Sequence, residues 1–308
     1  MHNKYWIFFK KAGILLLLMV ALDIGIGKLL EHYFFNMKSG ETARITYGMT
    51  QAREEALIFG SSTANHHYIP SILNDSLHLS TYNLGIDGEG ILFHYCLLKN
   101  ILQRTSPGII LLNIDIDEFE ESVNRYDKLN VLLPYYQLNK DIQPVINLRR
   151  RFEKFKAFSN LYRYNSYILP ILLNNLIHRQ DSSRSGYLPL NQTNSPVPLS
   201  NQGEDVSNLD SIRIKYFHLF IQEAKKSGSR VVVLISPIYR ANRNIISKTI
   251  SLASNICESE NVPFINNVDL EPFNDHPEYF RDPFHLIHSG AQLYTKYIAS
   301  LMVRDLGL

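Results

Sequence analysis

The sequence has few cysteines and little charge imbalance, and each of these two shortages argues against a class of protein. It also has no internal repeat. Two cysteines in 308 residues, Cys96 and Cys257, exclude a disulfide-dense scaffold. Basic residues number 31 and acidic residues 29, so the net charge of +2 gives no support for nucleic-acid binding. Hydrophobic residues make up 45% of the chain and charged residues 19%, which predicts a globular protein and not a disordered one.

The longest hydrophobic run lies near the N-terminus, from Ala12 to Leu22, and lysines at positions 4, 10 and 11 precede it. Aromatic residues stand on both sides of this run, which is typical of a helix that crosses a membrane. The sequence therefore predicts a membrane anchor within residues 1–35. Because lysines favour the cytoplasmic side, we expect a single pass through the cytoplasmic (inner) membrane, with the rest of the chain on the extracytoplasmic, periplasmic side.

Asp23 interrupts the predicted anchor, and a carboxyl in hydrocarbon costs about 2.5–3.5 kcal/mol on insertion scales. Two explanations stay open: the carboxyl is protonated, or it pairs with a partner helix. A cleaved signal peptide is the alternative to an anchor, but no A-x-A cleavage site follows the hydrophobic run, which favours an uncleaved helix. Residues 36–55 then turn polar and are predicted to be a linker.

From residue 56 onwards, short apolar runs alternate with stretches of helical spacing. This alternation predicts a parallel sheet covered on both faces, a three-layer α/β/α domain that is doubly wound around about five strands and spans 56–308. The expected strands are 56–59, 81–84, 109–112, 230–235 and 263–265, and the expected helices include 91–102, 209–226, 245–258 and 288–301.

The alternation lapses between residues 118 and 208, which we interpret as a helical and loop insertion over the sheet edge. Its basic triplet, Arg149–Arg151, is predicted to be a solvated helix face and not a binding patch. Its tyrosines have two interpretations, packing in a core or stacking on a sugar, and core packing is the simpler one. These tyrosines are Tyr135, Tyr136, Tyr162, Tyr164 and Tyr167.

Two short motifs carry the candidate chemistry. The first expected strand ends in Gly60-Ser61-Ser62, so a serine hydroxyl is placed at the carboxyl end of the sheet, where open α/β folds bind ligands. Near the C-terminus, Asp282 stands three residues before His285. A serine needs a base to remove its proton, and a carboxylate that orients the base makes it effective. Ser62, His285 and Asp282 are therefore the candidate catalytic residues.

An acyl-transfer site also needs donors for the negative charge that develops on the carbonyl oxygen. Gly88 lies in the glycine-rich turn after the second expected strand and can present its backbone N–H. Asn113 follows the third strand and can present its side-chain amide, although Asp115 could take that place at the sheet edge instead.

Together these motifs resemble the four blocks of the SGNH (GDSL-like) hydrolase superfamily. Ser62 stands for the nucleophile of G-D-S, Gly88 and Asn113 for the second and third blocks, and Asp282 with His285 for the D-x-x-H block. Ser61 replaces the Asp of G-D-S, which looks like the membrane-tethered branch that modifies envelope polysaccharides. The resemblance implies acyl transfer through an acyl-serine, by an O-acetyltransferase (or other O-acyltransferase) or esterase that acts on an extracytoplasmic polysaccharide.

The same resemblance implies no cofactor and no metal. It implies an acylated polysaccharide or acyl donor as partner, with a membrane acyltransferase as a further candidate. Two other functions stay open: a non-catalytic SGNH-like protein that binds glycans or scaffolds an export machine, and a lipase-like esterase.

Each motif also has an ordinary structural interpretation. Ser61 and Ser62 could cap the following helix, and Asp282 could cap a turn. His66 and His67 could be metal ligands, but surface or groove histidines are favoured because no third ligand stands at an ordinary spacing.

Overall fold

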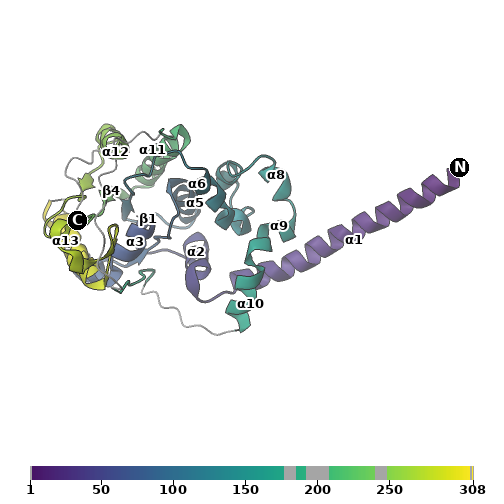
Figure 1. Ribbon diagram of the computed structural model, residues 1–308, viewed down its shortest axis with the longest axis horizontal. Coiled ribbons are helices and arrows are strands. Elements are labelled where there is room, and N and C mark those ends of the chain that lie inside the picture. The colour runs from purple at the N-terminus through teal and green to yellow at the C-terminus, as the bar shows by residue number, and fades with distance from the viewer. Residues whose placement is uncertain (1, 177–184, 192–207, 240–247, 306, 308) are drawn as a thin grey trace. The chain divides into compact units, whose positions relative to one another are not determined.

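A computed structural model of the chain describes residues 2–176, 185–191, 208–239, 248–305 and 307 (Figure 1). The chain divides into two compact units. We call them the helical unit, Met1–Ala43 with Leu129–Asp181, and the sheet unit, Arg44–Lys128 with Ser182–Leu308. Most of the predicted insertion thus joins the N-terminal helix instead of the sheet, so the units divide the chain differently from the predicted 1–35, 36–55 and 56–308. The predicted linker holds a helix, α2 (Gly40–Thr50), inside which the boundary falls.

The sheet unit is built on five parallel strands in the order β2-β1-β3-β4-β5. The predicted α/β class with about five strands is confirmed, and each predicted strand is found within two residues of its expected ends. The strands are β1 (Ala56–Gly60), β2 (Thr81–Asn83), β3 (Ile109–Asn113), β4 (Arg230–Ile235) and β5 (Phe264–Asn266).

Helices cover both faces of this sheet, which explains why β1 and β3 are buried throughout. On one face, Ile58 and Leu111 pack in a core with residues of α3, α4 and α13. On the other, Phe59 meets Phe220 of α11 at a ring-centroid distance of 5.2 Å, and α11 packs against α5. The helices are α3 (Ser62–His67), α4 (Pro70–Leu77), α5 (Ile91–Ile101), α6 (Val123–Asp127), α11 (Ser211–Lys226), α12 (Lys248–Ser259) and α13 (His288–Asp305).

An antiparallel pair of short strands, β6 (Phe280–Asp282) and β7 (His285–Leu286), precedes α13. Two single-turn 3₁₀ helices, η4 (Phe273–Asp275) and η5 (Pro277–Tyr279), lead into this pair. The predicted helices 91–102, 209–226 and 288–301 are confirmed as α5, α11 and α13, and the described part of 245–258 is confirmed as α12; residues 245–247 lie outside the described residues.

The helical unit consists of α1 (His2–Phe35) and short helices from the insertion. Helices α9 and α10 lie beside the C-terminal part of α1 (Figure 1), and both contact α1. The phenyl ring of Phe34 packs on the rings of Tyr135, Tyr164 and Tyr167. These three tyrosines therefore pack in the core of the helical unit, as the simpler interpretation predicts. The short elements are η1 (Lys128–Tyr135), η2 (Lys140–Ile142), α7 (Gln143–Ile146), α8 (Glu153–Lys156), α9 (Asn160–Tyr164), η3 (Asn165–Tyr167) and α10 (Ile168–Leu176).

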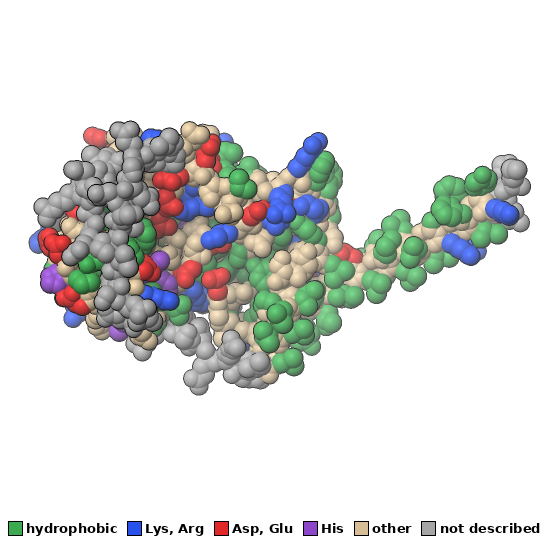
Figure 2. Space-filling model, in the orientation of Figure 1, with side chains coloured by type: hydrophobic (Ala, Val, Ile, Leu, Met, Phe, Trp, Pro, Cys, Tyr) green, Lys and Arg blue, Asp and Glu red, His purple; other side chains and the backbone are tan. Residues whose placement is uncertain are grey.

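Helix α1 is long and apolar enough to cross a membrane, with a mean hydropathy of 2.2 in its most apolar window. Residues 4–22 are exposed on all sides, whereas Gly27 and Phe34 further along are buried within the helical unit. The exposed apolar side chains of α1 run along its free length in Figure 2.

Candidate active site

Ser62 is placed by a tight turn between β1 and α3. Gly60, the last residue of β1, has φ +143°, and a Cβ at this position would lie 2.3 Å from the carbonyl oxygen of Asn113 on the adjacent strand. Only glycine fits this conformation and this approach. Ser61 stands at the N-cap of α3 but makes no capping hydrogen bond with its side chain, so capping does not explain the serine pair.

His285 and Asp282 lie at the adjoining ends of the β6–β7 pair, with Asp282 opposite His285 in the register. The Asp282 carboxylate lies 2.8 Å from His285 Nδ1 and also accepts the backbone N–H groups of Phe284 and His285, at 3.0 and 3.1 Å. Burial by itself would raise the pKa of Asp282, but these hydrogen bonds and the His285 charge outweigh it and hold the pKa below its usual value. The carboxylate therefore caps this turn and orients the imidazole at the same time.

The structure brings Ser62, His285 and Asp282 into one chain of hydrogen bonds. His285 Nε2 lies 2.7 Å from Ser62 Oγ. Because an ionised carboxylate only accepts, Nδ1 of His285 carries the hydrogen toward Asp282 and Nε2 is left to accept the Ser62 hydroxyl. This is the protonation pattern that lets a histidine act as a general base toward a serine.

A cavity of about 410 Å³ opens at this hydrogen-bonded chain. Two exposed cations, Lys128 and Arg281, line this cavity. The side chains of Ser62, His285 and Asp282 line it as well. The full lining is Ser62, His66, Asp87, Gly88, Lys128, Leu190, Arg281, Asp282 and His285.

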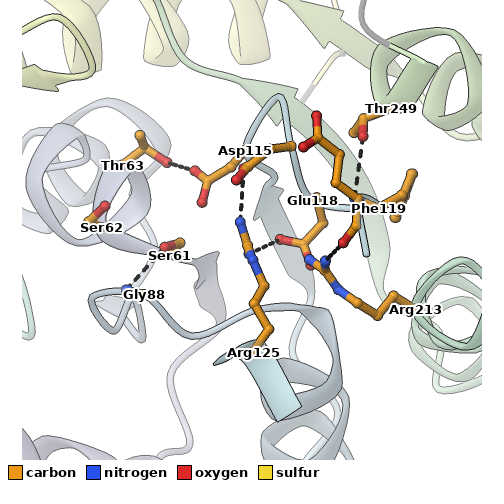
Figure 3. A network of polar contacts seen from close by, with 12 residues as sticks. Ser61, Ser62, Thr63, Gly88, Asp115, Glu118, Phe119, Arg125, Arg213 and Thr249 are labelled. Carbon is orange, nitrogen blue, oxygen red and sulfur yellow. Dashed lines mark hydrogen bonds and ion pairs between the residues drawn. The ribbon is translucent and has the colours of Figure 1, made fainter. Parts of the chain in front are cut away.

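Gly88 also lies at the cavity, in a turn with φ +73°, where a Cβ would lie 2.0 Å from Lys128 Nζ. Its N–H donates to Ser61 Oγ at 3.2 Å, and Lys128 Nζ donates to its carbonyl at 3.1 Å. The N–H predicted as an oxyanion donor is therefore held next to the nucleophile turn, with the Ser61 hydroxyl as its acceptor (Figure 3).

Asn113 and Asp115 both reach this turn, through Thr63. Asn113 Nδ2 donates to Thr63 Oγ1 at 2.6 Å. The Thr63 hydroxyl donates to Asp115 Oδ1 at 2.9 Å (Figure 3). The other end of the Asn113 amide accepts from Tyr68 and Ser236, at 2.7 and 2.8 Å. The amide is thus fixed one residue away from Ser62, and its role as an oxyanion donor stays a prediction.

Asp115 helps to hold the turn, because it accepts a hydrogen bond from the Thr63 hydroxyl at 2.9 Å. Burial raises the pKa of the Asp115 carboxyl and the Asp117 charge raises it further, against the opposing effects of Arg125 and the neighbouring hydroxyls. Serine at position 61 therefore has a structural use, because its hydroxyl oxygen accepts the Gly88 N–H at 3.2 Å.

His66, predicted to be a surface or groove histidine, lines the cavity and is 4% exposed, but its partners were not predicted. Its Nδ1 lies 2.7 Å from the Leu188 carbonyl oxygen, and its Nε2 lies 3.2 Å from Asp87 Oδ2. Hydrogen bonds to His66 and Asn65 lower the pKa of Asp87 to about 2 against the opposing effect of its burial, so this carboxylate is ionised. Both imidazole nitrogens therefore face acceptor oxygens, which hold the ring in place from two sides. The sequence held one signal that His66 lies beside Ser62: the two residues are four positions apart, and residues four apart share a helix face.

His67 points the other way, into the core, where it supports β7, the strand that carries His285. Its Nε2 accepts the N–H of Leu286 at 2.9 Å. Burial lowers the pKa of His67, and the neighbouring His285 and His66 lower it further, so the ring stays neutral and keeps this nitrogen as an acceptor. Of the two histidines, His66 therefore fits the groove alternative, whereas His67 is buried in the core and fits neither the surface nor the groove prediction.

No protein-family model matches the chain, and no curated protein matches its sequence. Solved structures that are similar to it include a lipolytic protein of the G-D-S-L family from Desulfitobacterium hafniense, 9% identical, covering 80% of this chain and 99% of its own, with a TM-score of 0.39. A GDSL-like lipase from Bacteroides thetaiotaomicron is 11% identical over 89% of this chain and 99% of its own, with a TM-score of 0.39. An acetyl xylan esterase is 12% identical over 82% of this chain and 99% of its own, with a TM-score of 0.40. At such low identities and scores these likenesses assign no activity, and the chemistry rests on the geometry of the site.

Proposed function

We propose that this protein is an SGNH-type serine acyl-transfer enzyme that acts on acyl esters. Acetyl esters are the favoured substrates in this proposal. The observation that carries the proposal is the continuous chain from Ser62 Oγ through the His285 imidazole to the Asp282 carboxylate, at 2.7 and 2.8 Å, at the mouth of a cavity. A protein that only bound a ligand would have no use for a hydroxyl, a base and an orienting carboxylate aligned in this order.

In the proposed reaction, His285 Nε2 takes the proton of the Ser62 hydroxyl while Ser62 Oγ attacks the ester carbonyl carbon. The negative charge that forms on the carbonyl oxygen is stabilised by the Gly88 N–H, which must exchange the Ser61 hydroxyl for this oxygen, and by the predicted Asn113 amide. The carbon–oxygen bond to the leaving alcohol then breaks, and His285 returns the proton to that oxygen. Water or a sugar hydroxyl attacks the acyl-serine by the same steps in reverse.

The substrate in this proposal is an acyl group on, or destined for, an extracytoplasmic polysaccharide. It is supported by the resemblance of the Gly60-Ser61-Ser62 block to the envelope-modifying branch of the superfamily and by the membrane-length helix. The partners are then the acyl donor or acylated polysaccharide, with a membrane acyltransferase as a candidate source of the acyl group.

The proposed location follows from α1. We propose that α1 is a single-pass anchor in the cytoplasmic membrane and that the rest of the chain lies on the periplasmic side, because lysines at positions 4, 10 and 11 precede the apolar run. A reporter that is active only in the periplasm, fused after Leu308, is expected to give signal in cells. Signal from a cytoplasm-only reporter at the same position would reverse this topology.

The proposal predicts that a fluorophosphonate adds once to the protein, at Ser62. Intact-mass analysis of the wild-type chain in detergent is expected to show one adduct, and Ser62→Ala is expected to show none. Ser61→Ala is the matched control, because it removes the neighbouring hydroxyl and leaves Ser62 with His285. An adduct that persists in Ser62→Ala, or no adduct on folded wild-type protein, would point away from an activated Ser62 and toward a binding protein.

A further inference from the structure

The segment 149–158 of the helical unit has its polarity inverted: the carboxylate of Glu153 is buried and three phenylalanines are exposed. Glu153 is 1% exposed, whereas Phe152, Phe155 and Phe158 are 58%, 68% and 71% exposed. Single exposed apolar residues are common, but three large exposed rings within seven residues form one apolar patch. Such patches mark surfaces that contact a protein or a membrane.

The buried carboxylate fixes this inversion. Glu153 accepts from Arg149 at 3.0 Å, from Lys156 at 2.8 Å and from the Tyr162 hydroxyl at 2.6 Å. Burial by itself would raise the pKa of Glu153, but these partners outweigh it and lower the pKa, so the carboxylate stays ionised. Turning the phenylalanines inward would break this set of charged hydrogen bonds, so the rings are held outward.

Basic side chains surround the exposed rings. Arg151 and Lys154 are exposed, and the Arg151 guanidinium lies over the Phe152 ring, 4.8 Å from its centroid. Basic and hydrophobic side chains lie together over α8 in Figure 2. The arginine triplet was predicted to be a solvated helix face, but its members differ. Arg149 donates to the buried Glu153, whereas Arg151 lies over the exposed Phe152 ring, so basic and aromatic side chains share this surface. Aromatic rings with cations are the composition of segments that lie in a membrane interface.

The residues directly after this segment are fixed to the membrane-length helix α1. Asp23 of α1 accepts from the Ser159 hydroxyl at 2.5 Å and from the backbone N–H groups of Asn160 and Leu161 at 2.9 and 3.1 Å. Gly27, one turn further, allows the close approach, since a Cβ there would lie 2.2 Å from Asn160 Cβ. Asp23 therefore pairs with the start of α9 in its own chain, which answers the question that the sequence left open.

The length of the apolar run places this junction at the edge of the hydrocarbon. From Ala12 to Leu22 a helix rises only about 16 Å, against about 30 Å of hydrocarbon. The hydrocarbon must then extend past Lys10 and Lys11 on one side or reach Asp23 on the other. Residues 4–22, which are exposed on all sides, rise about 28 Å and match the hydrocarbon, whereas Asp23 packs against α9. The crossing therefore extends past Lys10 and Lys11, and Asp23, with Phe158 next to its partner Ser159, lies near the membrane edge.

We propose that the segment 149–158 lies in the headgroup region of the lipid leaflet from which α1 emerges, with Phe152, Phe155 and Phe158 inserted among the acyl chains and Arg151 and Lys154 at anionic headgroups. The proposal rests on α1 crossing the membrane. It gives the protein a second membrane contact beside its anchor, so that the helical unit is held against the bilayer and cannot swing freely on α1.

Tryptophan fluorescence tests this contact, because the chain has one tryptophan, Trp6, in α1. The full-length protein is reconstituted into phosphatidylcholine–phosphatidylglycerol vesicles whose acyl chains carry bromine near the headgroups, which quenches nearby indoles. Three proteins are compared: the wild type, Trp6→Phe with Phe155→Trp, and Trp6→Phe with Leu172→Trp. Leu172 is the matched control, a 51% exposed leucine on α10, whose Asn175 contacts α1 at Tyr33, well past Asp23.

We expect the indole at position 155 to lose about half or more of its emission in brominated vesicles and to be shielded from iodide, and the indole at 172 to be quenched less by lipid. Arg151→Glu with Lys154→Glu should weaken the quenching at 155 in these vesicles. Quenching at 155 no greater than at 172, while Trp6 of the wild type is quenched, overturns this inference alone. Shielding of 155 from iodide without lipid quenching overturns it in favour of a protein contact. An unquenched Trp6 overturns the anchor itself.

Discussion

Replacing Asp282 with asparagine is expected to lower the turnover of an activated acetyl ester by about 10³–10⁴-fold while the protein stays folded. The substitution keeps the size of the side chain but removes the charge that stabilises the His285 imidazolium as the Ser62 proton is transferred. An amide can also present its NH₂ group to Nδ1, and the histidine would then carry its hydrogen on Nε2, where it cannot accept from Ser62. Steady-state hydrolysis of the ester by wild type and Asp282→Asn in detergent measures the effect.

Glu278→Gln is the matched control, since it makes the same carboxylate-to-amide change four residues earlier. Glu278 is exposed and pairs with His276, 2.7 Å away. Its turnover should equal that of the wild type. Full turnover in Asp282→Asn would remove this carboxylate from the catalytic chain, whereas an equal loss in both variants would indicate damage to the local structure.

The pH dependence of Asp282 follows from the direction of its shift. Its pKa in the folded protein lies below its usual value, so the carboxylate is ionised at neutral pH and stays so into mildly acidic solution. The stabilisation that its ionised form gives the β6–β7 turn is complete above about pH 4 and is lost as the pH falls through the lower, folded pKa. Loss of activity between neutral pH and pH 5 would therefore not come from protonation of Asp282.

The parallel sheet could be predicted because buried strands in such sheets are continuous apolar runs, as in Ile109–Leu112, with glycine or polar residues where they end. The same logic placed Ser62 at the carboxyl edge of the sheet, since the turn after the first strand must lie there. The D-x-x-H spacing placed Asp282 and His285 together because three residues span one turn. These features are local, or they follow from sheet topology.

Contacts between distant residues could not be predicted in the same way. Nothing near Asp23 in the sequence indicates that Ser159 and the start of α9 would supply its donors, since the partners are 136 and more positions away. The choice between Asn113 and Asp115 was not resolved either, because both reach the turn through one side chain, Thr63. The partners of His66 could not be predicted, because the Leu188 carbonyl and the Asp87 carboxylate meet it only in the folded chain.

A buried ion pair in the sheet unit is another contact between distant residues that the sequence did not indicate. Glu118, 3% exposed, lies 2.6 Å from Arg213 of α11, which is 1% exposed (Figure 3). The same carboxylate accepts the backbone N–H of Ile91, the first residue of α5, at 2.9 Å. Arg125 joins Glu118 at 3.3 Å and Asp117 at 2.8 Å. Glu118 therefore connects α11, the start of α5 and the loop that carries Asp115.

Glu118→Ala is expected to destabilise the sheet unit by about 3–5 kcal/mol, because it leaves the Arg213 guanidinium buried without its carboxylate and removes the acceptor of Ile91. For a unit of this size the loss corresponds to a drop of roughly 6–20 °C in the unfolding temperature, measured by thermal unfolding of the full chain in detergent. Glu223→Gln is the control: it breaks the ion pair between Lys99 and Glu223, whose side chains are 19% and 28% exposed, and should cost about 1 kcal/mol or less.

A double variant separates the two causes of the loss. Burial lowers the pKa of Arg213 despite the Glu118 charge, so the cost of Glu118→Ala should come mainly from this stranded cation. Glu118→Leu with Arg213→Met replaces both charges with apolar side chains and should unfold at a higher temperature than Glu118→Ala alone, while Arg125 keeps its pair with Asp117. If the double variant were instead less stable than Glu118→Ala, the hydrogen bonds of this pair, and not the burial of an unpaired charge, would be what joins α11 to the loop behind Ser62.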